Sequence, residues 1–520
     1  MVVDIDASED LKLLGNAAFK ERHWLQAESY YSQAIDRNPA NHVLWSNRAA
    51  AHLHLEEYGS AIADANKAIE LAPSFTKAYY RRGEAQFSLS HFPEAVADFR
   101  SAAKLSPKDP MLRKRLLESE RLLKIRRFEE ALAMPEDTTS ALRNVVLGDI
   151  VVEESYAGLM MERAEDDGDS GAARYKLTRD FVLEMVEEFK QERKVHRRFL
   201  TQIILESYEK LRELPSLVDV NVPNGDFITV CGDTHGQFYD LLKIFELNGM
   251  PSRENPYLFN GDFVDRGSWS FEVVMTLLAF KAVDTDSVHL TRGNHESKSM
   301  NQIYGFYGEV KAKMGQSAVE VFRELFCAMP LAYVLNKQVM VVHGGIPTCE
   351  GGDLDSLRKI NRVREPPDAG PMCECLWNDP QDMPVRQGYT SMDTRFHDLL
   401  SRDLLSHVSR SALAFQGTTP NKRGVGYAFG PDVTKKYLEE NGLSLLVRSH
   451  EVKEAGYELA HDGYCCTIFS APNYCDQMGN KGAFIRFNGS DMVPHFTQFD
   501  ASPHPDVPAM KFASNMFSQF

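Results

Sequence analysis

The stretch Val230-Cys231-Gly232-Asp233-Thr234-His235-Gly236 decides the fold of the larger part of this chain. Two related blocks follow it, Gly261-Asp262-Phe263-Val264-Asp265-Arg266-Gly267 and Arg292-Gly293-Asn294-His295-Glu296. A short apolar run precedes each block, and we predict that each run is a buried strand: 227–231, 256–259 and 287–290. The blocks then form tight turns at the carboxyl ends of the strands, where side chains converge on one edge of a sheet.

Polar side chains also follow two later apolar runs. Residues 339–342 precede His343, and residues 445–448 precede Ser449 and His450. The candidate metal ligands share this placement at strand ends: Asp233, His235, Asp262, Asn294, His343 and His450. A lone histidine near a strand end is usually a core residue. Three histidines, two aspartates and an asparagine, all at turn positions after strands, instead predict a metal centre. Their mixed oxygen and nitrogen donors suit manganese, with iron or zinc as alternatives.

Two neighbouring metals need a bridging ligand, and the central Asp262 carboxylate is predicted to bridge them. Asp233 and His235 would complete the ligand shell of the first metal. Asn294, His343 and His450 would complete that of the second metal. A water shared by the metals would lose a proton near neutral pH and act as the nucleophile.

The same blocks supply groups for phosphoryl chemistry. Arg266 follows Asp262 by four residues, and its guanidinium could fork onto phosphoryl oxygens; Arg423 is a second candidate. His295 could protonate the leaving oxygen, and Asp265 could orient that imidazole. Spacing alone leaves a structural salt bridge as an equal alternative for either arginine.

Other reaction classes lack their motifs. No cysteine precedes an arginine by six residues, and no Gly-Lys pair of a Walker-type loop is present. Glu454 stands where an HExxH protease motif would need its second histidine. The sequence therefore disfavours covalent cysteine chemistry and ATP-driven chemistry.

Composition narrows the function further. The net charge of −16 argues against a general nucleic-acid binder, and no run of about 18 apolar residues predicts a membrane span. The acidic first ten residues do not resemble a signal peptide. All eight cysteines lie between Cys231 and Cys475 without CxxC pairs, which predicts a reducing compartment, cytosolic or nuclear.

The first hundred residues repeat with a period of 34, as Pro39, Pro73 and Pro107 illustrate. Further positions recur in phase: Gly15, Ala49 and Gly83; Ala27, Ala61 and Ala95; Ala34, Ala68 and Ala102; Leu11, Trp45 and Tyr79. This pattern predicts three tetratricopeptide repeats over residues 8–108, each a helix pair that buries its face only against its neighbours. A helix over 111–131 would seal the last repeat and complete a domain at 8–132.

Five polar residues of this domain could line one groove: Lys12, Asn16, Asn47, Lys77 and Arg81. Lys12 and Asn16 are four residues apart on one helix face, and Lys77 and Arg81 repeat that arrangement two repeats later. Such cations and amides could grip a C-terminal carboxylate through charge-assisted hydrogen bonds. Solvated surface charge is the alternative.

The remaining boundaries follow from composition. Residues 133–175 are predicted to be an acidic linker with strand character at 144–152. A catalytic domain at 176–508 would contain helices over 179–214, 271–282 and 317–326. An insertion at 383–419, with helical patches around 396–408, interrupts it. The tail 509–520 is either a docked helix or frayed.

The three blocks resemble the signature of the phosphoprotein phosphatase family of serine/threonine phosphatases, as do Leu376-Trp377-Asn378-Asp379-Pro380, Arg448-Ser449-His450-Glu451 and Ser470-Ala471-Pro472-Asn473-Tyr474-Cys475-Asp476. The repeats narrow the resemblance to the type-five branch. It implies an α/β metallophosphoesterase domain, a central β-sandwich flanked by helices, after an all-α repeat array. It also implies single-step hydrolysis of phosphoserine and phosphothreonine on proteins.

The resemblance implies roles for particular residues. Arg266, Asn294, Arg423 and Tyr474 would bind the phosphate, and Tyr474 would lie near the attacking water. Trp377 and Cys475 would lie near the substrate groove.

The resemblance also implies regulation. The repeat domain is expected to inhibit the active site, with Glu56 reaching Arg423 and Tyr474; a solvated loop glutamate is the alternative. The five groove residues match the dicarboxylate clamp for C-terminal tails of Hsp90-type chaperones. Such a tail, or a fatty acid, would shift the population toward the active state. The insertion is longer than the family leads us to expect, and the tail is not clearly its inhibitory helix.

Two other functions remain open at this stage. A metallophosphoesterase acting on dinucleotides or phosphodiesters would share the metal-binding blocks. A catalytically weak, chaperone-bound scaffold would share the repeats.

Overall fold

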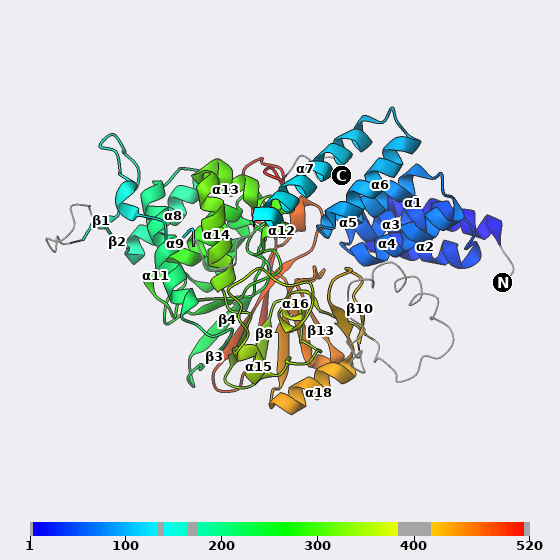
Figure 1. The fold of residues 1–520 in the computed structure, drawn as a ribbon. Helices are drawn as coiled ribbons and strands as arrows, with labels where there is room; N and C mark the ends of the chain where they lie inside the picture. Colours follow the sequence, from blue (N-terminus) through cyan, green and yellow to red (C-terminus); the bar gives the residue numbers. More distant parts are fainter. Residues whose placement is uncertain (1–3, 133–139, 165–174, 383–417, 514–520) are drawn as a thin grey trace. The chain divides into compact units, whose positions relative to one another are not determined.

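The computed structural model describes residues 4–132, 140–164, 175–382 and 418–513. The described chain divides into two compact units (Figure 1), the first containing residues 4–132 and 418–428 and the second residues 140–164, 175–382 and 429–513. The predicted helical patches of the insertion, around 396–408, lie outside the described residues. Among the described helices, none has the combined length and apolarity of a membrane span.

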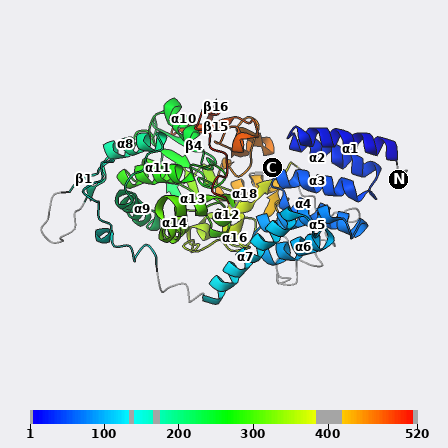
Figure 2. The ribbon, with the colours of Figure 1, turned by 90° about the horizontal axis from the view of Figure 1, so that it is seen from above.

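Antiparallel helices in sequence order build the repeat array of the first unit (Figure 2). They are α1 (Ile5–Lys20), α2 (Trp24–Arg37), α3 (His42–His54), α4 (Tyr58–Leu71), α5 (Thr76–Ser88), α6 (Phe92–Leu105) and α7 (Pro110–Leu132). The alanines that recur at period 34 are fully buried: Ala27, Ala61, Ala95, Ala34, Ala68 and Ala102. A Cβ atom at Gly83 would lie 2.9 Å from Cε1 of Phe99, so α5 and α6 approach too closely there for a larger residue. The three predicted repeats and the sealing helix are confirmed.

The same ion pair joins the two helices of the second repeat and those of the third. Arg48 Nε lies 2.7 Å from Asp64 Oδ2, and 34 residues later Arg82 Nε lies 2.9 Å from Asp98 Oδ2. Both carboxylates are almost fully buried, and each guanidinium lies over the aromatic ring three residues before it. These pairs hold the two helices of the second and third repeats together through paired, hydrogen-bonded charges.

Two sheets dominate the second unit, with strand orders β16-β15-β4-β5-β6 and β13-β14-β12-β8-β7-β3. The strands of the first sheet are β4 (Phe227–Cys231), β5 (Tyr257–Phe259), β6 (Val288–Leu290), β15 (Gly482–Asn488) and β16 (Pro494–Phe499). Those of the second are β3 (Leu217–Val220), β7 (Ala332–Leu335), β8 (Val339–Val342), β12 (Leu445–Arg448), β13 (Tyr457–Ala460) and β14 (Cys465–Ile468). The five predicted strands are confirmed to within one residue. β4, β5 and β6 run parallel to one another, as do β8 and β12, so their carboxyl ends meet.

Helices cover the outer face of each sheet (Figure 1). They are α8 (Arg179–Lys190), α9 (Arg197–Arg212), α10 (Phe238–Asn248), α11 (Ser270–Val283), α12 (Lys298–Tyr304), α13 (Phe306–Met314), α14 (Gln316–Ala328), α15 (Leu354–Arg358), α16 (Pro371–Trp377) and α18 (Pro431–Asn441). Alternation along β8 shows the layering: Val339 and Val341 pack between the sheets, while Met340 and Val342 pack against Leu357 of α15 and Leu438 of α18. The predicted β-sandwich flanked by helices is confirmed.

Short elements complete the described chain. They are β1 (Glu162–Arg163), β2 (Tyr175–Lys176), β9 (Asp379–Pro380), β10 (Thr418–Pro420), β11 (Tyr427–Phe429) and three 3₁₀ turns, Leu147–Asp149, His461–Gly463 and Tyr474–Asp476.

The structure corrects one local prediction. Residues 144–152 form a turn and a 3₁₀ helix and not a strand, and just before them the Glu324 carboxylate accepts the backbone N–H of Ala141. Leu142 and Met161 are buried in the core of the second unit, so residues 140–164 pack on that unit. The helical pattern predicted over 179–214 is confirmed, and it is divided into α8 and α9, since Glu192 adopts φ +54° and the ring of His196 caps α9.

Candidate metal centre

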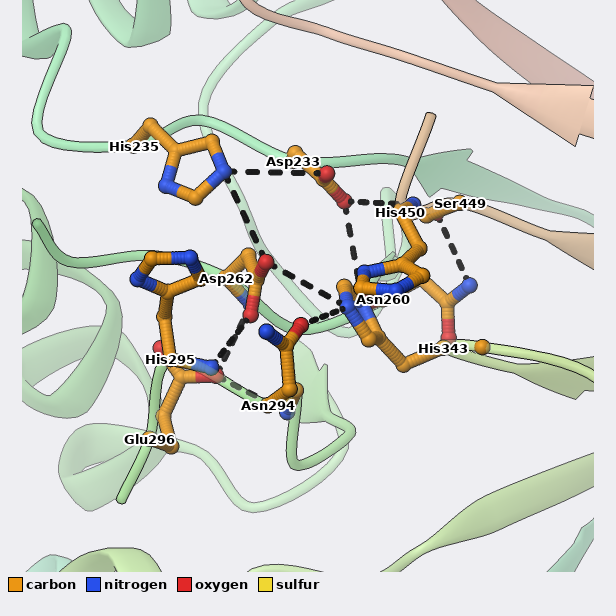
Figure 3. A network of polar contacts seen from close by, with 12 residues as sticks. Asp233, His235, Asn260, Asp262, Asn294, His295, Glu296, His343, Ser449 and His450 are labelled. Carbon is orange, nitrogen blue, oxygen red and sulfur yellow. Dashed lines mark hydrogen bonds and ion pairs between the residues drawn. The ribbon is translucent and has the colours of Figure 1, made fainter. Parts of the chain in front are cut away.

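The six predicted ligands converge where β4, β5, β6, β8 and β12 end (Figure 3). Three of them adopt the left-handed backbone conformation that non-glycine residues avoid: His235 at φ +38°, Asp262 at +50° and His450 at +70°. Such strain persists only where the surrounding structure enforces it, and it is common at functional sites. The strained backbone of these turns directs the three side chains toward the centre of the cluster.

Asp262 lies at the middle of the cluster. His235 Nε2 lies 3.5 Å and His343 Nε2 lies 3.3 Å from Asp262 Oδ2. The other carboxylate oxygen, Oδ1, accepts the backbone N–H of His295 at 2.9 Å. One oxygen of Asp262 therefore faces imidazoles from two different strand ends, the arrangement needed for a bridging ligand.

Hydrogen bonds set the orientation of both imidazoles. His235 Nδ1 donates to the carbonyl of Val264 at 3.0 Å, and His343 Nδ1 donates to that of Asn260 at 2.8 Å. Each Nε2 is thereby presented to the centre as a potential ligand. His343 Nε2 also lies 2.9 Å from Asn294 Oδ1.

Two groups of side chains could each hold a cation: His235, Asp262 and His295, and Asp262, His343 and His450. Their potential ligand atoms lie within 4.8 Å of one another, and Asp262 is shared. Asp233 completes the cluster, with Oδ2 3.8 Å from His235 Nε2 and Oδ1 accepting the N–H of His450 at 3.3 Å.

The electrostatics of the cluster call for added positive charge. Burial, with the nearby Asp262 charge, raises the pKa of Asp233 to about 7, and the same two causes raise that of Glu296 to about 7. Burial lowers the pKa of His235 to about 3, so this imidazole is a neutral donor. Burial opposes protonation of His343 too, but Asp262 and Asp233 raise its pKa to about 9. Buried carboxylates beside imidazoles whose Nε2 atoms face the same point fit divalent cations, which would take the place of the proton on His343.

The predicted acid and its orienting residue also meet. His295 Nδ1 lies 2.9 Å from Asp265 Oδ2, while Asp265 Oδ1 accepts the N–H of Phe306 at 2.9 Å. Burial disfavours the charged ring, but Asp262 and Asp265 outweigh it and raise the pKa of His295. The protonated imidazole that a general acid needs is thus favoured.

The other predicted substrate-binding residues of this unit line the same turns. Arg266 packs its guanidinium over the Tyr304 ring at 3.8 Å. The ring of Tyr474 lies 5.2 Å from that of His235, and the ring of Trp377 lies edge-on to His450 at 5.5 Å. The backbone N–H of Cys475 donates to Gln237 Oε1 at 3.4 Å.

Sequence reasoning missed the supports of the centre. Glu296 stands within a quoted block, yet its role emerges only in the fold, where its carboxylate accepts the N–H groups of Asp262, Phe263 and Gly293, each at 2.8 Å. A Cβ atom at Gly293 would lie 2.2 Å from Asp262 Oδ1, which explains the glycine there. In the sequence, only the recurring Gly-Asp and Gly-Asn pairs indicated that the backbone would come so close to the ligand side chains.

The remaining predicted residues belong to the first unit. Arg423 lies in the loop between β10 and β11, and Glu56 lies in the turn between α3 and α4 at φ +61°. Both residues are thus assigned to the first unit, whereas the six predicted ligands are assigned to the second.

Three of the groove residues form a chain of hydrogen bonds across α1, α3 and α5. Asn47 Nδ2 donates to Asn16 Oδ1 at 3.2 Å, and Arg81 Nη1 donates to Asn47 Oδ1 at 3.3 Å. Lys12 and Lys77 lie one turn away on α1 and α5, and Lys12 pairs with Glu9. Burial lowers the pKa of Arg81 to about 10, so an added carboxylate would stabilise its charge.

Comparison with known proteins agrees with this architecture. Residues 228–454 match the family described as calcineurin-like phosphoesterase, residues 116–219 the PPP5 TPR repeat region, and residues 12–74 and 66–110 the tetratricopeptide repeat. Serine/threonine-protein phosphatase 5 of Homo sapiens is 44% identical over 509 residues, 98% of this chain and 93% of that protein. Its namesake from Solanum lycopersicum is 45% identical over 585 residues, 99% of this chain and 98% of that protein.

A solved structure is also similar. It is a protein serine/threonine phosphatase from Saccharomyces cerevisiae with similarity to human phosphatase PP5. It aligns with a TM-score of 0.56 at 35% identity, covering 64% of this chain and all of that chain.

Proposed function

This chain belongs to the type-five family of serine/threonine-protein phosphatases, and on that premise we propose that its six converging ligands hold two divalent cations. The proposed ligands are Asp233, His235, Asp262, Asn294, His343 and His450. The observation that carries the proposal is the Asp262 carboxylate, which two imidazoles approach at 3.5 and 3.3 Å. Manganese is our first choice, with iron or zinc as alternatives.

Bound cations would lower the pKa of a nearby water and neutralise phosphoryl charge. Side chains of this protein would bind the phosphate and protonate the leaving group. Arg266, Asn294, Tyr474 and Arg423 would bind the phosphoryl oxygens of phosphoserine or phosphothreonine. His295 would donate a proton to the leaving seryl or threonyl oxygen, and Asp265, bound to Nδ1, would keep the imidazole protonated and aimed.

Replacement of Asp262 with asparagine tests the metal assignment. The Asp262→Asn variant keeps the size of the side chain but removes the negative charge. We expect it to lose more than about a hundredfold in kcat on a phosphoserine peptide, together with bound manganese. Asp491→Asn, at an exposed turn, is the matched control. Unchanged turnover and metal content in Asp262→Asn would remove the bridging assignment.

The same assay separates the other two functions. Faster hydrolysis of a dinucleotide than of the phosphoserine peptide would favour a different metallophosphoesterase. Activity toward neither, in protein that holds two metals, would favour the scaffold.

We further propose that the repeats restrain catalysis. The support lies within the first unit, where the turn after α3 contacts the loop that carries Arg423. The backbone N–H of Ser60 donates to the carbonyl of Lys422 at 3.1 Å, and Lys422 Nζ lies 3.4 Å from Glu57 Oε1. Glu56 immediately precedes Glu57, so a carboxylate that mimics phosphate would approach the Arg423 loop from this turn.

A charge exchange tests this restraint. Glu57→Lys places two cations together, so we expect basal activity to rise several-fold, and adding Lys422→Glu should restore the low activity. Glu70→Lys, exposed on α4, the helix that begins directly after Glu57, is the control. Activation that Lys422→Glu fails to reverse, or no activation at all, would refute this contact as the restraint. Deleting residues 1–140 should raise basal activity in the same way.

We also propose that Lys12, Asn16, Asn47, Lys77 and Arg81 bind the C-terminal carboxylates of an Hsp90-type chaperone tail. Arg81 supports this proposal, because its desolvated guanidinium lies on the hydrogen-bonded chain with Asn16 and Asn47. Binding there, or binding of a fatty acid, would shift the population away from the restrained state.

An acidic peptide with a free carboxyl end should bind and stimulate the enzyme. Lys77→Ala or Arg81→Ala should abolish both effects, whereas Lys104→Ala, exposed on α6, should not. Equal stimulation by a peptide with an amidated end would refute the clamp. All eight cysteines are free thiols, which supports the proposed cytosolic or nuclear location; fractionation of cells tests it.

A further inference from the structure

Residues 500–513, here called the strap, run along the turns that hold Arg266 and Tyr474 in the second unit. The backbone N–H of Ser502 donates to Asp240 Oδ1 at 2.7 Å, which anchors the first part of the strap. Nothing in the sequence predicted this segment to be near the metal centre.

The strap supports one strained turn directly. Asp265 and Arg266 both adopt φ +69°, so two successive non-glycine residues are left-handed. The carbonyl of Arg266 accepts the backbone N–H of Met510 from the strap at 2.8 Å. Ser268 Oγ donates to the carbonyl of Pro508 at 2.7 Å and accepts the N–H of Lys511 at 3.2 Å. Three hydrogen bonds thus fasten the strap to the turn of Arg266.

The strap also contacts the second strained turn. Around Tyr474, Asn473, Cys475 and Asp476 have φ of +42°, +54° and +59°. His504 Nε2 lies 3.1 Å from Asp476 Oδ1, in this turn, and the His504 ring stands edge-on to Trp269 at 5.2 Å. One imidazole therefore joins the turn of Tyr474 to the turn of Arg266.

We propose that the strap is a positioning device, in which His504 and Ser268 hold Arg266 and Tyr474 at the separation that a phosphoryl group requires. This inference rests on the proposed phosphate-binding role of those two residues. Left-handed backbone at non-glycine residues persists only where contacts over-determine it, so loosening the strap lets both turns relax. Misplacing a binding group by a fraction of an ångström weakens phosphate binding without removing any phosphate ligand.

His504 makes this device sensitive to pH. Its Nδ1 lies 2.9 Å from the carbonyl of Pro505 and its Nε2 faces Asp476, so both nitrogens face acceptors and only the imidazolium satisfies both. The other titratable groups that face it are Asp240 and Tyr239. Partial burial works against the charge, but the Pro505 carbonyl and Asp476 outweigh it and raise the pKa of His504. The strap is therefore fastened at low pH and loosens as the pH rises through that raised pKa.

The test measures the inhibition constant of inorganic phosphate against p-nitrophenyl phosphate, with the full-length manganese enzyme. We expect His504→Ala and Ser268→Ala to raise this constant roughly five- to twentyfold, with two metals still bound per chain. His504→Gln, which can still bond Asp476 but carries no charge, should recover part of the affinity. The inhibition constant of His504→Gln, divided by that of the native enzyme, should approach one as the pH rises from 6 to 8, because the native imidazole also loses its charge over that range. His495→Ala, an exposed histidine of β16, is the control.

Arg266→Ala distinguishes this inference from the function on which it rests. If Arg266→Ala weakens phosphate binding while His504→Ala and Ser268→Ala bind phosphate as the native enzyme does, the strap is not a positioning device. If Arg266→Ala itself binds phosphate normally, the assigned role of Arg266 fails. If His504→Ala does not fold, Ser268→Ala and the pH profile of His504→Gln decide the question.

Discussion

Replacing Glu296 with glutamine should weaken both the stability of the catalytic unit and its affinity for manganese. The buried carboxylate accepts three backbone N–H groups, with Oε2 receiving those of Asp262 and Gly293 and Oε1 that of Phe263. The best orientation of a glutamine keeps its oxygen toward the first two and turns its NH₂ group toward the N–H of Phe263. One buried donor then loses its acceptor.

Above pH 7, where Glu296 with its pKa of about 7 is ionised, a hydrogen bond to its charged carboxylate contributes about 1.5–3 kcal/mol. At such a pH the loss should lower the melting temperature of this unit by roughly 3–10 °C. Because the same carboxylate fixes the strained backbone of Asp262, affinity for manganese should also fall about 10- to 100-fold. Scanning calorimetry measures the first effect, and calorimetric titration of metal-free enzyme measures the second. Glu440→Gln, at an exposed position on α18, is the control. Native melting and native manganese affinity in Glu296→Gln would refute the role of this carboxylate.

Three further predictions follow from buried charge. Asp98→Asn should lower the stability of the repeat unit by about 2–4 kcal/mol in denaturant titrations, because it removes the carboxylate that balances the charge of Arg82 and leaves only the Asn66 amide beside it; an unchanged midpoint would contradict this. Burial lowers the pKa of His54 to about 4, below that of the unfolded chain, so stability present above about pH 6.5 should be lost as the pH falls toward 4. His54→Phe should remove this decrease in stability at low pH, as measured by hydrogen exchange in α3. An equal decrease in His54→Phe would refute the assignment of the decrease to His54. Removing the bound manganese with a chelator at pH 7.5 should lower the melting temperature by roughly 6–15 °C. The decrease should be smaller at pH 5.5, because Asp233, with its pKa of about 7, is protonated there and binds the metal less tightly. A larger decrease at pH 5.5 than at pH 7.5 would contradict this.

The candidate metal centre could be predicted from the sequence because each of its proposed ligands stands beside its own local indicator. His343 directly follows the apolar run of β8, and Asp262 is preceded by Gly261 at φ +85°. Strand ends and glycine turns are properties of a few adjacent residues, so the sequence displays them. The repeats were equally visible, because the same contact recurs every 34 residues, as the buried Ala61 and Ala95 show.

Predictions failed where a distant partner overrides local preference. Residues 144–152 are rich in valine, which favours a strand, yet they belong to no strand of the described structure, and Glu324 binds the backbone just before them, at Ala141. The break between α8 and α9 depends on His196, whose ring caps the second helix while its backbone N–H donates to the hydroxyl of Tyr156. Neither partner could be deduced from hydrophobic periodicity.

The strap shows why chemistry is easier to predict than its support. Arg266 was recognised from a block of seven adjacent residues, but the N–H that binds its carbonyl belongs to Met510, 244 residues later. Ser268 lies two residues after Arg266, yet nothing local indicated its proposed positioning role, since a serine hydroxyl can serve almost any turn. A reacting group must be of one chemical type, whereas a support needs only a donor or acceptor in the right place. Many residue types can provide that support from anywhere in the chain, so it becomes visible only when the chain is folded.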